Sequence, residues 1–163
     1  MKNRKRGFSL VELLIVLAVI AALIATITPV ALNAIRKSQA TKVAQNIKTL
    51  AAAIENAAYV NGVTDDHEIK RNNVNAFTAT TDIEFLGRDI DETAYGVWYE
   101  WDATKKEFKV AVFTTETVDD ETAASVLDGL TKTSINSGSY THRLGIDTVS
   151  DNVLVYTFTF DVY

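Results

Sequence analysis

The chain has 163 residues, of which 16 are Lys or Arg and 21 are Asp or Glu, so its formal net charge is −5 at pH 7. This length fits one anchored domain rather than two globular ones, and the acidic balance argues against a surface that binds nucleic acid nonspecifically. The chain contains no cysteine. A disulfide framework is therefore excluded, and packing, a metal or subunit contacts must supply stability.

The N-terminal stretch combines a basic start with a long apolar run. Four basic residues precede Gly7, namely Lys2, Arg4, Lys5 and Arg6. From Phe8 to Ala25 the only charged side chain is Glu12. A helix over residues 8–30 would be about 34 Å long, which is enough to cross a membrane core. The basic start predicts that the N-terminus stays in the cytoplasm and that the C-terminal part is exported.

This stretch resembles the class III signal of type IV prepilins and their pseudopilin relatives. The resemblance rests on the basic residues, on Gly7 and Phe8, and on the sequence Ser-Leu-Val-Glu-Leu-Leu-Ile-Val-Leu over residues 9–17. The resemblance is strong over residues 6–40. In the rest of the chain it is limited to the general order of elements, a helix followed by a connecting region and a sheet. It implies that a prepilin peptidase removes the leader, residues 1–7, by cutting between Gly7 and Phe8, and then methylates Phe8. Many pilins of Gram-negative bacteria close a C-terminal loop with a disulfide, and this chain departs from that pattern.

Glu12 is the feature of the apolar run that needs an explanation. A carboxylate in hydrocarbon costs several kcal/mol unless it is protonated, reaches the interface or meets a positive partner. One reading places Glu12 near the headgroups, helped by the positive end of its own helix. The resemblance implies another role, in which Glu12 pairs with the Phe8 amine of a neighbouring subunit in a filament and sets the stagger between subunits.

The sequence predicts one long helix over about residues 8–59, ended by Asn61 and Gly62. Residues 8–30 are its hydrophobic half, and residues 31–60 are its amphipathic half. Pro29 follows three β-branched residues, so we expect a kink or local melting there, and the resemblance implies that this segment extends during assembly. An apolar stripe marks the second half: Val43, Ile47, Leu50, Ile54 and Ala57 or Ala58. This stripe predicts packing against a sheet, with a coiled-coil seam as the alternative.

The rest of the chain divides into a connecting region and a sheet. Residues 61–95 are polar and poorly periodic, and they predict an exposed connection with a short helix or strand at 83–87. Residues 96–163 predict a hairpin of strands 96–101 and 107–113, a short amphipathic helix within 117–130, and strands 139–146 and 153–162. The predicted fold class is α+β and pilin-like, with the long N-terminal helix packed against an antiparallel sheet of about four strands.

Alternation along the first predicted strand separates its aromatic residues. Val97, Tyr99 and Trp101 point to one face of the sheet and Trp98 to the other. One of these faces is core, and a subunit interface or an adhesive surface is the alternative for the other, with core as the default for most of the aromatic residues. The sequence does not decide which face is which.

Three groups of side chains carry residue types that occur in metal or catalytic sites. The first, a possible metal site, is better read as a solvated acidic turn: Asp65, Asp66, His67 and Glu68. The second, a possible calcium site, is better read as charge at a helix start: Asp119, Asp120, Glu121 and Asp128. The third has the residue types of a catalytic triad but no nucleophile elbow: Ser139, His142 and Asp147. We therefore predict no enzyme, no metal and no cofactor.

Taken together, the sequence predicts a structural subunit of a type IV pilus that polymerises through its N-terminal helix into an extracellular filament for adhesion, motility or DNA uptake. Its expected partners are identical or related pilin subunits, the prepilin peptidase, the pilus assembly machinery and, before assembly, the cytoplasmic membrane. Direct nucleic-acid binding is not expected. The alternatives are a major pseudopilin of a type II secretion system and a membrane-anchored binding or enzymatic domain that never polymerises.

Overall fold

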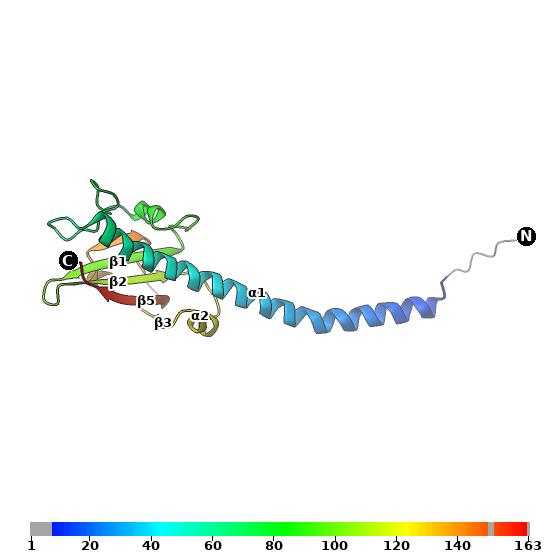
Figure 1. The fold of residues 1–163 in the computed structure, drawn as a ribbon. Coiled ribbons are helices and arrows are strands. Elements are labelled where there is room, and N and C mark those ends of the chain that lie inside the picture. Colours follow the sequence, from blue (N-terminus) through cyan, green and yellow to red (C-terminus); the bar gives the residue numbers. More distant parts are fainter. Residues whose placement is uncertain (1–7, 150–151, 163) are drawn as a thin grey trace, which may run out of the picture. The chain divides into compact units, whose positions relative to one another are not determined.

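The structure is a computed structural model that describes residues 8–149 and 152–162. Its helices are α1 (Leu10–Asn61) and α2 (Asp120–Val126), with short 3-10 helices η1 (Thr80–Phe85) and η2 (Ser137–Ser139). Its strands are β1 (Tyr95–Asp102), β2 (Glu107–Thr114), β3 (Leu130–Thr133), β4 (His142–Gly145) and β5 (Val153–Phe160) (Figure 1). The chain divides into two compact units, residues 1–36 and 37–163, and α1 contributes to both.

The first unit is the apolar part of α1. Its large hydrophobic side chains are exposed on every side of the helix, from Leu10 at 75% to Ile20 at 46% and Ile35 at 54%. α1 is long and apolar enough to span a membrane. A helix that is apolar all round is stable in water only when something covers it, so this segment requires lipid or other helices.

The helix continues through Pro29 without interruption, so the local melting expected there does not occur in this state of the chain. Two neighbouring hydroxyls are satisfied by the helix itself. Thr26 Oγ1 donates to the Leu23 carbonyl at 2.9 Å, and Thr28 Oγ1 donates to the Ile24 carbonyl at 2.7 Å. Pro29 removes only one backbone donor, and the surrounding turns keep the helical conformation.

The second unit is built on the amphipathic part of α1 and a five-stranded sheet. The predicted stripe is confirmed: α1 buries a face at helical spacing, made of Ala40, Val43, Ala44, Ile47, Leu50, Ala51, Ile54 and Ala58. These side chains share a core with Val97 and Tyr99 of β1 and Phe108 of β2. The stripe therefore packs on the sheet of its own chain.

All strand pairs of the sheet are antiparallel, in the order β3-β5-β2-β1-β4. The predicted hairpin is the β1–β2 pair, with Tyr95 opposite Thr114 and Asp102 opposite Glu107. The sheet has one strand more than the four expected. The helix predicted within 117–130 ends at Val126, and Gly129, at φ +84°, turns the chain so that β3 can pair with β5.

The two faces of the sheet are both covered. Tyr99 faces α1, as does Val97, whereas Trp98 lies in a second cluster with Ala111, Phe113, Tyr140, Val153 and Val155, and this confirms the predicted alternation. Ile135, Ile146 and Val149, which lie before and after β4, pack against this second cluster, and Trp98 Nε1 donates to the Ile146 carbonyl at 2.6 Å. Trp98 is therefore a core residue, as expected by default for most of these aromatic side chains, and the alternative of an open interface or adhesive surface does not apply to it.

The connecting region is more firmly held than its polar composition suggested. Asn61 Nδ2 donates to the carbonyls of Lys70 and Arg71, at 3.2 and 3.0 Å. Phe77 and Ile83 are buried in the main core. The short helix or strand predicted at 83–87 is a short 3-10 helix, η1, which begins and ends slightly earlier in the chain.

Candidate functional site

The candidate site lies at the N-terminus of α1, where the side chains of Ser9 and Glu12 each accept a hydrogen bond from a backbone amide. Ser9 Oγ accepts from the Val11 amide at 3.3 Å, and Glu12 Oε2 accepts from the Ser9 amide at 2.8 Å. This is a variant of the capping box, in which Glu12 reaches back to the Ser9 amide as usual but the Ser9 hydroxyl caps the Val11 amide, one residue earlier than in the standard motif. The spacing Ser-x-x-Glu is a sequence signal for this arrangement, and the sequence reading did not use it.

The capping box fixes where the Glu12 carboxylate lies. It is held against the positive end of its own helix, where a negative charge is favourable. The bonded amide belongs to Ser9, the residue directly after Phe8, so the carboxylate and the residue expected to carry the new amine lie at the same helix end. Phe8 is 89% exposed. Gly7, on the other side of the expected cut, lies outside the described residues.

Pro29 lies far from this helix end. It follows Glu12 by seventeen residues, about 25 Å along a helix, so the structure brings Phe8 and Glu12 together but not Pro29. The apolar side chains between them are exposed. The candidate site is therefore the end of a helix whose large apolar side chains from Leu10 to Ile35 are exposed and available to lipid or to other helices.

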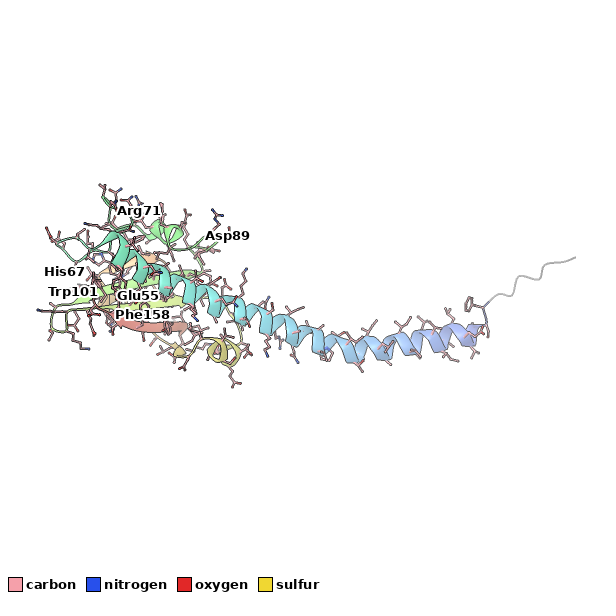
Figure 2. The ribbon with its side chains drawn as sticks, viewed as in Figure 1. Glu55, His67, Arg71, Asp89, Trp101 and Phe158 are labelled. Atoms are coloured by element: carbon pink, nitrogen blue, oxygen red, sulfur yellow. The ribbon has the colours of Figure 1, made fainter. Side chains whose placement is uncertain are left out.

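Neither candidate metal site forms a cluster. Within residues 8–149 and 152–162, no three His, Asp or Glu side chains come together as metal ligands would. The His67 ring stacks on Trp101 with centroids 4.5 Å apart (Figure 2). Asp120 pairs with Lys132 at 2.9 Å, and the Asp119 carboxylate accepts from the Thr122 hydroxyl.

The residues with triad chemistry are likewise separated by other contacts. His142 stacks on Tyr99 at 4.6 Å between centroids, and Asp147 pairs with Arg143 at 3.2 Å. Ser139 belongs to η2. Among the described residues, His142 thus contacts Tyr99 and Asp147 contacts Arg143, and these contacts do not link the two to Ser139 as a proton relay would.

Residues 2–28 match the family model described as the prokaryotic N-terminal methylation motif. No curated protein and no solved structure matches the chain. The match identifies this segment as the class III signal peptide of type IV pilins and pseudopilins. The motif, the long apolar helix and the α+β layout together support a protein of the pilin and pseudopilin class.

Proposed function

We propose that the chain is a structural subunit of a type IV pilus. The observation that carries this proposal is the methylation motif at residues 2–28 together with the helix that begins inside it at Leu10, whose large apolar side chains are exposed up to Ile35. Such a helix suits two environments in turn, the membrane before assembly and a bundle of identical helices afterwards. The second unit, with its own core, then forms the outside of the filament.

Processing precedes assembly in this proposal. The prepilin peptidase cuts between Gly7 and Phe8, removes residues 1–7 and methylates Phe8. Residues 8–30 hold the precursor in the cytoplasmic membrane with the N-terminus inside, as the leader's basic residues favour. Pilus assembly machinery in that membrane then adds the subunit to an extracellular homopolymer, whose use is adhesion, motility or DNA uptake.

Glu12 sets the register between subunits. Two opposite charges attract strongly where water is excluded, and either one alone is costly there. In the filament the Glu12 carboxylate pairs with the Phe8 amine of a neighbouring subunit. The capping bond from the Ser9 amide supports this role, because it keeps the carboxylate at the helix end. Pro29 supplies the point at which the helix is easiest to extend, since it lacks a backbone donor.

Microscopy of a deletion strain tests the proposal. Surface fibres labelled by an antibody against the second unit should be present in the parent, absent in the deletion strain and restored by the full chain. A strain that keeps its fibres unchanged on deletion would contradict the structural role. Loss of protein export on deletion, with no labelled fibre in the parent, would favour the pseudopilin, which has the same N-terminal motif.

A further inference from the structure

Asn61 and Gly62 form the only Asn-Gly pair in the chain, and they lie where α1 ends. Asn61 is the last residue of the helix. Gly62 has φ +80°, the left-handed conformation in which glycine commonly follows a helix. An asparagine before glycine loses its side-chain amide as ammonia more easily than other asparagines, because glycine has no side chain to shield its backbone nitrogen. The glycine that ends the helix therefore makes its neighbour chemically labile.

The Asn61 side chain fastens the connecting region to the helix end. Asn61 Nδ2 donates to the carbonyls of Lys70 and Arg71, at 3.2 and 3.0 Å. Both partners are acceptors, so the nitrogen of the side-chain amide faces them, since the oxygen has nothing to donate. The Lys70 amide donates back to the Gly62 carbonyl at 3.0 Å. These three bonds join residues 70 and 71 to the end of α1.

The same contacts protect the labile side chain. Deamidation begins when the Gly62 nitrogen attacks Asn61 Cγ, which requires that nitrogen to give up its proton and Asn61 to leave the helical ψ. In the structure the Gly62 N–H donates to the Ala58 carbonyl at 3.1 Å. The leaving nitrogen, Nδ2, is held by its two carbonyl partners. The reaction can therefore start only when the helix end and residues 70–71 separate.

Water, the other reactant, is close to the pair. Asn61 lines a hollow of about 540 Å³ together with residues 72–75, and all four of these residues are exposed. No heavy atom lies within 4 Å of the position that a Cβ of Gly62 would occupy. The pair is therefore protected by its hydrogen bonds and not by burial.

We propose that Asn61 is a latent deamidation site, which the fastened connecting region protects and which local opening of that region exposes. The Gly62 nitrogen bonds to Cγ, the Cγ–Nδ2 bond breaks, and ammonia leaves with the proton that Gly62 gives up. Water then opens the cyclic imide and leaves aspartate or isoaspartate at position 61. An ionised carboxylate only accepts hydrogen bonds, so it repels the carbonyls of Lys70 and Arg71 and the region stays released. This chemistry belongs to the single subunit and does not depend on the proposed pilus.

Peptide mass spectrometry of the full-length chain in detergent follows the reaction. Deamidation raises the mass of the tryptic peptide 49–70, and fragmentation separates Asn61 from Asn56 within it. In guanidinium chloride, we expect Asn61 to react faster than Asn136, which precedes a serine. At the same pH and temperature, Asn61 of the native chain should react at least about tenfold more slowly than in guanidinium chloride, the factor that an opening free energy of about 1.4 kcal/mol gives. Equal rates in the two conditions, or no reaction of Asn61 in guanidinium chloride, would overturn the proposal.

Two variants distinguish local opening from global unfolding. Asp82→Ala removes the carboxylate that pairs with Arg71 Nη1 at 2.8 Å, so it should speed the native reaction at Asn61. Trp98→Phe weakens the second cluster, on the other face of the sheet, and should leave the rate nearly unchanged. Equal acceleration by both variants would show that the whole unit must unfold, and it would overturn protection by the local contacts.

A third variant tests the consequence of the reaction. Asn61→Asp carries the product side chain, and we expect the Lys70 amide to exchange its hydrogen at least about tenfold faster in it, equivalent to about 1.4 kcal/mol. Asn56→Asp makes the same change at an exposed residue of α1 and should leave this exchange unaltered. Unaltered exchange in Asn61→Asp would contradict the release of the connecting region.

Discussion

Asp82 is the residue whose removal should most weaken the connecting region. It is 5% exposed and lies in η1, and its carboxylate accepts from Arg71 Nη1 at 2.8 Å. It also accepts from the amides of Thr78 and Ala79, at 2.9 and 3.0 Å. Arg71 in turn lies over the Phe85 ring at 4.3 Å, so one carboxylate connects three parts of the segment.

The size of the loss follows from these contacts. A hydrogen bond to a charged group contributes about 1.5–3 kcal/mol to stability, and Asp82→Ala removes three of them. Water replaces some of these bonds, because the Arg71 side chain is 25% exposed. We therefore expect a loss of about 3 kcal/mol for Asp82→Ala, a large share of a small domain's stability. Urea unfolding of residues 37–163, followed by tryptophan fluorescence, measures it, since every buried core residue lies in that range.

Glu84→Ala, an exposed change in the same 3-10 helix, is the matched control and should stay within about 0.5 kcal/mol of the parent. A loss below about 1 kcal/mol for Asp82→Ala would refute the reasoning, because the three bonds would then contribute no more than an ordinary surface contact. The region would be held by Phe77 and Ile83 instead.

Four further predictions follow from other contacts. Burial raises the pKa of Asp82, but the hydrogen bonds from Ala79, Thr78 and Arg71 outweigh this effect and leave the pKa below 3.8. The difference in free energy of unfolding between the parent and Asp82→Asn should therefore be at its full size above about pH 4. It should shrink at lower pH, as the carboxylate is protonated. Gly145 has φ +74°, and a Cβ there would lie 2.1 Å from the Tyr95 carbonyl oxygen. Gly145→Ala should therefore lower the free energy of unfolding in urea more than Gly62→Ala, where φ is +80° but the space around the Cβ is open. Equal losses would mean that the backbone relaxes freely around the new Cβ. Trp98→Phe removes the bond to the Ile146 carbonyl and should cost about 1–3 kcal/mol by the same assay, and an unchanged midpoint would contradict that bond. Glu12→Gln should leave cleavage intact in an immunoblot but lower the yield of sheared fibres at least about tenfold, equivalent to about 1.4 kcal/mol; a normal yield would dismiss the charge pairing.

The sequence predicted the features that depend on local pattern. The methylation motif, the long helix and the β1–β2 hairpin could be predicted because charge, apolar periodicity and turn residues lie close together in the chain. The stripe from Val43 to Ile54 also predicted correctly which face of α1 is buried.

The features that were missed depend on contacts between distant residues. β3 forms only because Gly129 turns the chain toward β5, and four residues carry too little pattern to predict a strand. The burial of Trp98 requires a loop that begins more than thirty residues later. Asp82 is polar in sequence, and its burial follows only once Arg71 and two amides are brought around it. The Ser9–Glu12 capping box is local, and its spacing could have predicted it.

Mass spectrometry of filaments sheared from the native cell surface tests the central claim most directly. The account predicts that the main subunit begins at Phe8, carries one methyl group on that amine and has lost residues 1–7. Filaments whose subunits are other proteins, or a mature chain that still carries residues 1–7, would contradict it.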